Sequence, residues 1–144
     1  MQRLLDEGRR STLAWMSGDS GPAAQGMIHD ARFSIFGPFG GPSPAGWSDE
    51  FAARQAGAAK AFQGSVSSSV ELVRSYVTAD LVVLVLIERN EVQFAGHARP
   101  QPWVLRSTVV YQPDRDGQWK VVHRHADPLL AFRSLDETLK LHAR

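Results

Sequence analysis

The sequence predicts an α+β fold, a curved antiparallel sheet with N-terminal helices packed in its concave face. Three observations predict it. Helical patterns dominate the first third of the chain, strand-like segments follow one another in the second half, and a tight turn at residues 113–117 joins the last two of them. Strands that are segregated from helices are typical of α+β domains, whereas alternating strands and helices would indicate a parallel sheet.

Three helices are expected before the main sheet. Apolar side chains within residues 5–16 can share one face of a helix that ends at Gly18. A second, short helix is expected over residues 23–28. Ser48 is a suitable N-cap for a third helix, which would run to Phe62 and present a narrow apolar stripe to the sheet.

The strands are predicted from alternation and from apolar runs. Residues 31–36 alternate and predict a first strand. The run at residues 81–87 is apolar at both parities, as in a strand that is covered on both faces. Four strands in a meander are expected at residues 66–77, 81–87, 103–112 and 119–126.

Two further segments flank these elements. Residues 37–46 contain four Gly and three Pro, which excludes a helix or a central strand. This segment is either a plain connection or, because it holds Phe39, a rim over a pocket. After the last strand, Ser134 and Glu137 form a capping-box pattern, so a helical extension is expected within residues 129–144.

Composition limits the function. A chain of 144 residues is expected to form a single domain. The formal charge of +1 argues against binding to nucleic acid or to an anionic membrane, and the absence of Cys excludes thiolate zinc sites and cysteine nucleophiles. The first residues lack the pattern of a signal peptide, so a cytoplasmic location is expected.

The last strand holds the most suggestive polar residues. Trp119, Val121, His123 and His125 share one parity and form the more apolar set, so we expect them to face the interior. Asp127 would join the two imidazoles on that face if the strand continues. A partly dry imidazole beside a carboxylate is suited to general acid–base catalysis. Alternatively, the histidines hydrogen-bond to the backbone and Asp127 caps a turn.

A metal site is the less favoured alternative for this pair of histidines. His123 and His125 have a ligand spacing, but zinc or iron would need a third protein ligand, from Asp127 or from the distant His97. We therefore expect neither a metal nor a cofactor.

Arg106 lies within a predicted strand, between apolar neighbours. Its guanidinium either reaches solvent, pairs with an acid such as Glu88 or Glu71, or presents its planar fork to an anionic ligand. This assignment, like that of the histidines, depends on regular alternation, which a single β-bulge reverses.

Aromatic side chains are numerous enough to form the wall of a cavity, although ordinary core packing explains each of them equally well. Those expected to contact a ligand, together with Arg106, are Phe33, Phe39, Tyr76, Trp103, Tyr111 and Trp119.

Several segments resemble one superfamily in their order and spacing. They lie at residues 15–19, 36–41, 105–108 and 117–128, of which the last, with Trp-x-Val-Val-His-x-His, is the most specific. Over residues 10–130 the chain resembles the nuclear transport factor 2-like superfamily, in its SnoaL-like and ketosteroid-isomerase-like branch. The resemblance implies a cone-shaped, cystatin-like fold with an internal pocket, and a homodimer formed through the open face of the sheet.

The resemblance leaves the function open, because this superfamily includes both enzymes and non-catalytic modules. Gly37 stands where the steroid isomerases have their general-base Asp, which argues against isomerisation by that mechanism. One expectation is cofactor-free cyclisation, dehydration or hydration of a small apolar, carboxylate or ketone compound, with His123 or His125 moving the proton. Asp127 would orient the imidazole, and Arg106 or a Tyr would stabilise the oxyanion. The other is a small-ligand-binding or dimeric interaction module without catalysis.

Overall fold

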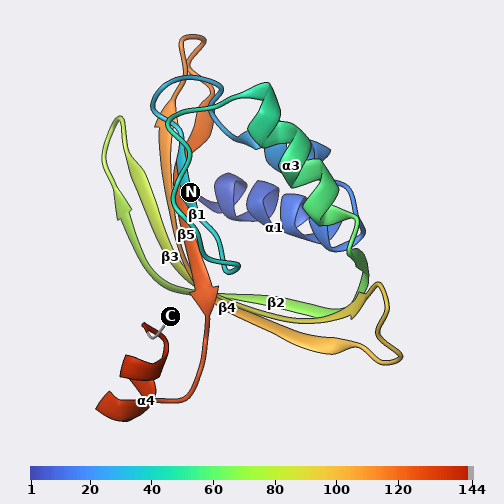
Figure 1. Cartoon of the computed structure of the whole chain (residues 1–144). Helices are drawn as coiled ribbons and strands as arrows, with labels where there is room; N and C mark the ends of the chain where they lie inside the picture. The colour runs from blue at the N-terminus through green and yellow to red at the C-terminus, as the bar shows by residue number, and fades with distance from the viewer. Residues whose placement is uncertain (143–144) are drawn as a thin grey trace.

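A computed structural model describes residues 1–142 and shows an α+β fold (Figure 1). The elements follow in the order α1 (Gln2–Met16), α2 (Gly21–Gly26), β1 (Ser34–Phe36), α3 (Asp49–Ala59), β2 (Phe62–Val77), β3 (Val82–Phe94), β4 (Gln101–Pro113), β5 (Trp119–Pro128) and α4 (Leu135–Lys140). The predicted fold class is confirmed.

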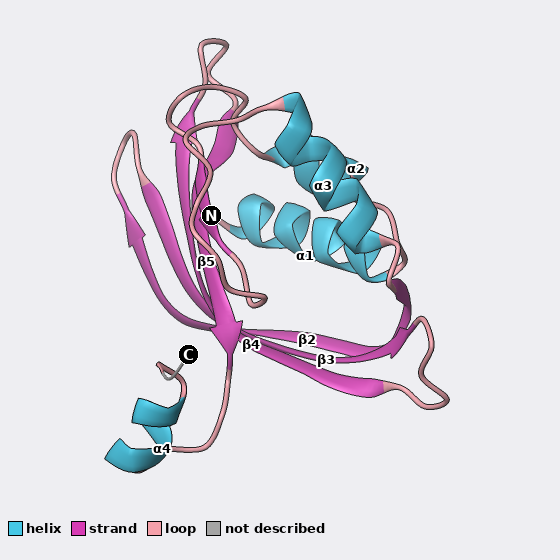
Figure 2. Cartoon of the chain, viewed as in Figure 1, coloured by secondary structure: helices cyan, strands magenta, loops and turns pink. Residues whose placement is uncertain are grey.

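The five strands form one sheet in the order β1-β5-β4-β3-β2. The four long strands are antiparallel neighbours, as expected of a meander, while β1 pairs in parallel with β5 at the edge. The sheet bends around α1, α2 and α3, which lie on its concave side, and α4 lies beyond the end of β5 on the other side (Figure 2).

The strands are longer than the sequence predicted, and the first is shorter. β2 begins at Phe62, where the third helix was expected to end, and α3 ends at Ala59. The first strand covers only Ser34–Phe36, because residues 31–33 form a turn before it. The caps occur as predicted. Ser48 Oγ accepts a hydrogen bond from the Phe51 N–H at 3.0 Å, and Ser134 and Glu137 form the capping box of α4.

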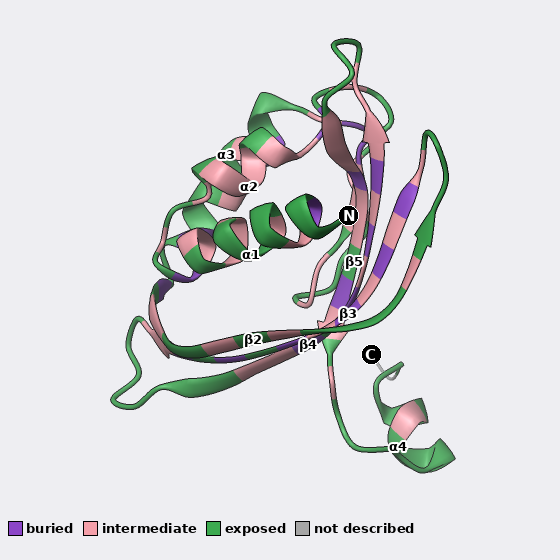
Figure 3. Ribbon diagram, turned by 180° about the vertical axis from the view of Figure 1, so that it is seen from behind, coloured by how far each residue is buried: buried purple, intermediate pink, exposed green. Residues whose placement is uncertain are grey.

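The core lies between the helices and the inward face of the sheet. Alternate residues of β3 are buried from Val82 to Val92, as the banding along that strand shows (Figure 3). Leu4 of α1 packs against the middle of the sheet, and Met16 at the other end of α1 packs against Phe62. Between these two contacts a space remains between α1 and the inward face of the sheet, and this space is part of the cavity described below. Within residues 1–142, no helix is long and apolar enough to cross a membrane.

Candidate functional site

A cavity of about 590 Å³ lies between α1, α3, the β1–α3 loop and the inward face of the sheet. Known small-molecule sites have volumes of roughly 300–1,000 Å³. The wall is mainly apolar and includes three of the four tryptophans of the chain. Representative apolar residues of the wall are Leu5, Trp15, Ile35, Leu86, Trp103 and Trp119.

The β1–α3 loop forms part of the wall of this cavity, which agrees with the second of its two sequence-based interpretations, a rim over a pocket. Gly37 and Phe39 both line the cavity. The Phe39 ring is exposed on its outer side and lies 5.6 Å, centroid to centroid, from the Trp103 ring. Gly46 fixes the far end of the loop: its φ is +89°, and a Cβ there would lie 3.1 Å from the Ala31 Cα. A side chain at position 46 would therefore displace the rim.

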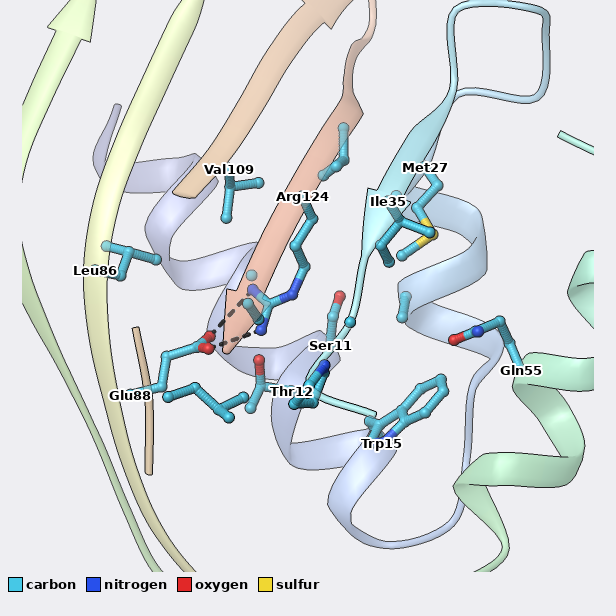
Figure 4. Close-up of a pocket in the computed structure, with 18 of the residues that line it drawn as sticks. Ser11, Thr12, Trp15, Met27, Ile35, Gln55, Leu86, Glu88, Val109 and Arg124 are labelled. Atoms are coloured by element: carbon cyan, nitrogen blue, oxygen red, sulfur yellow. Dashed lines mark hydrogen bonds and ion pairs between the residues drawn. The ribbon is translucent and has the colours of Figure 1, made fainter. Parts of the chain in front are cut away.

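An ion pair lies inside the cavity (Figure 4). Arg124 extends from β5 and Glu88 from β3, with Nη2–Oε2 and Nη1–Oε1 distances of 2.7 and 3.3 Å. The Glu88 side chain is 4% exposed and that of Arg124 24%. Burial alone would lower the pKa of Arg124, but the charge and hydrogen bonds of Glu88 raise it above its usual value. The cavity thus contains a fixed, charged pair in an otherwise apolar wall.

Two hydroxyl groups lie on the same inward face, both from β4. Tyr111 lines the cavity, and burial raises the pKa of its phenol to about 12, so the phenol remains a neutral O–H donor at physiological pH. Ser107 is 4% exposed, and its Oγ has no hydrogen-bond partner within the described residues. The sequence-based prediction that Tyr111 contributes to the pocket wall is consistent with its position.

A β-bulge in β5 decides which residues of the last strand face the cavity. His123 pairs with Val110 of β4, but the next registered pair is Val121 with Tyr111. Val122 is therefore the extra residue, and the side-chain alternation reverses on passing it.

The bulge turns both predicted catalytic histidines away from the cavity. The interior orientation expected for His123 and His125 is wrong, because it assumed unbroken alternation from Trp119 onward. A catalytic role for either imidazole stays a prediction, and such a role would have to act outside the cavity. The β5 residues that do line the cavity are Trp119 and Val121 before the bulge, and Arg124 and Ala126 after it.

The two histidines lie near the edge formed by β1. His123 Nδ1 is 2.7 Å from the Ser34 Oγ, and the Phe36 ring contacts both imidazoles edge-on, with centroid distances of 5.8 and 5.4 Å. These contacts match the alternative interpretation, in which the histidines are held by packing and hydrogen bonds.

Arg106 and Asp127 pair with each other on the outer face of the sheet. Arg106 Nε and Nη2 donate to the two carboxylate oxygens of Asp127 at 2.8 and 2.9 Å. This bidentate pair lowers the pKa of Asp127 and raises that of Arg106. The Arg106 side chain is 62% exposed and is paired with an acid, as two of its three sequence-based interpretations allow, although that acid is Asp127 and not Glu88 or Glu71. Arg106 does not line the cavity, so the third interpretation, a contact with a cavity ligand, is not found. His125 Nε2 lies 4.0 Å from Asp127 Oδ2, on the same outer face.

The predicted aromatic wall is found in part. Phe39, Trp103, Tyr111 and Trp119 line the cavity. Phe33 does not, because it is fully buried in a separate cluster with Ile28, Phe51 and Val122. Tyr76 lies near the end of β2 with its ring exposed, away from the cavity.

No group of three or more His, Asp or Glu side chains converges as a metal site would require, within the part of the chain that the structure describes. His97, considered as a distant third ligand, lies in the β3–β4 connection, where its ring contacts Phe94.

The cavity's main polar feature, the Arg124–Glu88 pair, is not predicted from the sequence. Unbroken alternation from Trp119 would put Arg124 on the outward face of the last strand, which is true only of a strand without the bulge. Glu88 had a usable signal: it shares the parity of Val82, Leu84 and Leu86, all buried. A carboxylate at the buried parity of a central strand indicates a paired or functional group.

Comparisons with known proteins identify the fold. A scan against protein-family models and a search of the curated proteins find no match. Among solved structures, a nuclear transport factor 2-like superfamily protein from Salmonella enterica superposes with a TM-score of 0.70 at 15% identity, covering 93% of this chain and 94% of the other.

Two further solved structures give the same answer. A proposed dehydratase of the NTF2-like family from Streptomyces avermitilis has a TM-score of 0.66 at 20% identity, with 90% of this chain and 96% of the other covered. A proposed calcium/calmodulin-dependent protein kinase type II association domain from Thiobacillus denitrificans has a TM-score of 0.65 at 20% identity, with 86% and 93% covered. The chain therefore has the fold of the nuclear transport factor 2-like proteins.

Proposed function

We propose that this protein binds a small, mostly apolar organic molecule in the cavity under α1, with Arg124 donating a hydrogen bond to an oxygen atom of that molecule. One observation supports the proposal most strongly: an apolar cavity of about 590 Å³ contains a single interior ion pair among the described residues. A few placed polar groups in an apolar cavity are typical of small-molecule sites.

Arg124 has N–H groups that Glu88 does not use and that can donate to such a ligand. A guanidinium carries five N–H groups, and Glu88 accepts from one on each of Nη1 and Nη2. No other acceptor within residues 1–142 bonds to this guanidinium. Tyr111 adds a neutral O–H donor to the same wall.

A titration with β-acetylnaphthalene tests the proposal, because this ketone combines an apolar ring with one carbonyl oxygen. We expect saturable one-to-one binding by calorimetry, and loss of that binding in Val109→Phe, which fills the cavity from β4. Val104→Phe is the matched control, since Val104 lies on the opposite face of the same strand and does not line the cavity. Equal binding by both variants would show that the ketone does not enter the cavity.

Acid–base catalysis on the bound molecule is a second candidate, favoured by the buried Glu88 carboxylate. Glu88 would remove a proton from the carbon beside the ligand carbonyl, and Arg124 would stabilise the enolate oxygen that results. Dehydration of a β-hydroxy ketone would follow if the β-hydroxyl then leaves as water, taking the proton that Glu88 removed and so restoring the Glu88 carboxylate. Glu88→Gln should abolish turnover of such a compound while retaining its binding, and retained turnover would exclude Glu88 as the base.

A homodimer is the third element of the proposal. The outward side chains of β3 include Val83, Val85 and Ile87, and α1, α2 and α3 all lie on the other side of the sheet (Figure 2). Phe132 and Leu135, on the segment beyond β5, are also strongly exposed. Pairing of two copies through the outer face would shield these apolar groups. Sedimentation equilibrium at micromolar concentration should give the mass of a dimer for the parent protein and that of a monomer for Val85→Asp. A monomeric parent protein would contradict the proposed homodimer and leave the proposed ligand binding unaffected.

A further inference from the structure

We propose that Glu88 sets the charge of the ligand, so that the cavity accepts neutral carbonyl or hydroxyl compounds and rejects carboxylates. This inference rests on the proposed function, namely small-molecule binding at Arg124. It concerns the effect of Glu88 on ligand specificity, which it exerts through its ion pair with Arg124.

The charges that line the cavity fall into two groups. Glu7, Arg9 and Arg54 belong to α1 and α3, and all three are exposed to solvent. Water screens these rim charges, so they contribute little to binding inside the cavity. Within the described residues, the interior charges are those of Arg124 and Glu88, which cancel.

This cancellation changes what Arg124 can recognise. An unpaired guanidinium in an apolar cavity would favour a carboxylate, because the two planar groups match and the charges attract. Here Glu88 already occupies that role, with a shortest N–O distance of 2.7 Å. A ligand carboxylate would add a second negative charge beside Glu88 in a poorly solvated site, and it would lose its hydration on entry.

A neutral carbonyl avoids both penalties. It loses only weak hydration, accepts a hydrogen bond from a guanidinium N–H that Glu88 does not use, and leaves the ion pair intact. The neutral Tyr111 phenol can donate to the same kind of oxygen without adding charge. The wall therefore offers donors together with zero net interior charge.

A matched pair of probes, β-acetylnaphthalene and β-naphthoate, tests this directly. The two share the naphthalene ring and a carbonyl group, but the ketone carries a methyl group where the carboxylate carries a negatively charged oxygen. In the parent protein at neutral pH, we expect the ketone to bind at least about tenfold more tightly than the carboxylate. Glu88→Gln should strengthen naphthoate binding by at least about tenfold and change ketone binding by less than about threefold, because it leaves Arg124 uncompensated. Glu7→Gln, which removes a carboxylate at the rim, is the control and should change neither.

A second measurement needs no variant, so it holds even if Glu88→Gln does not fold. If the cavity takes up only the protonated acid, the apparent affinity for naphthoate should rise by about tenfold for each unit that the pH falls toward the range of the naphthoic acid pKa, while that for the ketone stays constant. Equal binding of the two probes at neutral pH, or a pH-independent naphthoate affinity, would overturn the inference and leave the proposed function standing. Failure of both probes to bind would overturn the proposed function itself.

Discussion

Arg124 on β5 and Glu88 on β3 form an ion pair that spans the strand between them. Their N–O distance is 2.7 Å, although β4 separates β3 from β5 in the sheet. The β4 residues in register with them are Val109 and Leu105, and Ser107 lies midway between these two on the same face. The pair thus crosses β4 at its smallest inward side chain.

Breaking this ion pair should cost far more than breaking a surface pair. We expect Glu88→Leu or Arg124→Met alone to lower the free energy of unfolding by about 3–5 kcal/mol, because each leaves a buried charge without its partner. The double variant should cost less than the sum, and a urea-denaturation double-mutant cycle measures the difference.

Arg89 and Glu71 provide the matched control for that cycle. They also join at 2.7 Å, but their side chains are 49% and 55% exposed. Removing either should cost less than about 1 kcal/mol. Similar costs for the two pairs would contradict the burial of the Arg124–Glu88 pair inside the cavity.

Ser107 should tolerate a smaller side chain and reject a larger one. Ser107→Ala removes a hydroxyl that has no partner, so stability should stay within about 0.5 kcal/mol of the parent protein or increase. Ser107→Leu should cost about 1–3 kcal/mol, because the added methyl groups occupy the path of the ion pair. Thermal denaturation measures both, with Thr108→Leu on the outer face as control. If Ser107→Leu left the stability unchanged, the Arg124–Glu88 pair would not depend on a small residue at position 107.

The Tyr111 phenol should be visible in alkaline titration. Its pKa of about 12 exceeds the ordinary value of 10.0, so the unfolded chain loses this proton first as the pH rises. The stabilisation by neutral, buried Tyr111 is therefore complete below pH 10 and is lost as the pH rises toward 12.

Tyrosinate absorbance checks this in a Tyr76→Phe background, where Tyr111 is the only phenol left. Ionisation with a midpoint at the ordinary value would contradict the buried position of Tyr111. Tyr111→Phe should remove this part of the alkaline loss of stability and should weaken binding of the ketone probe.

The two imidazoles of β5 should be dispensable for the cavity. Because both side chains face away from it, His123→Ala and His125→Ala should leave binding of β-acetylnaphthalene unchanged within about twofold, a difference of less than 1 kcal/mol. His123→Ala should still cost about 0.5–1.5 kcal/mol in stability, since Ser34 loses its hydrogen-bond partner. Loss of binding in either variant, with the fold retained, would show that an imidazole reaches the ligand.

The fold could be predicted from sequence because it depends on patterns that span whole elements. Apolar runs, the turn at residues 113–117 and the caps at Ser48 and Ser134 each specify a strand, a hairpin or a helix start locally, and the structure contains all of them. The glycine- and proline-rich composition of residues 37–46 likewise predicted an irregular connection between β1 and α3.

The polar residues of the cavity could not be predicted from the sequence, because one extra residue in β5, Val122, determines which side chains of that strand face inward. Nothing in the sequence around Val122 distinguishes a bulge from regular pairing. Because of the bulge, however, Arg124 faces inward, while His123 and His125 face outward. Glu88 was within reach of the sequence, since its parity matches that of its buried neighbours in β3. Its partner was not, because Arg124 lies two strands away in the sheet.

In the proposed complex, a ligand oxygen accepts a hydrogen bond from Arg124 inside the cavity. Nitrogen-15 NMR of the arginine Nε–H groups during titration with β-acetylnaphthalene tests it most directly, with the Arg124 resonance assigned from Arg124→Met. This hydrogen bond should shift the Arg124 resonance saturably, while the Arg106 resonance on the outer face stays in place. Saturable ketone binding that leaves the Arg124 resonance unmoved would contradict it.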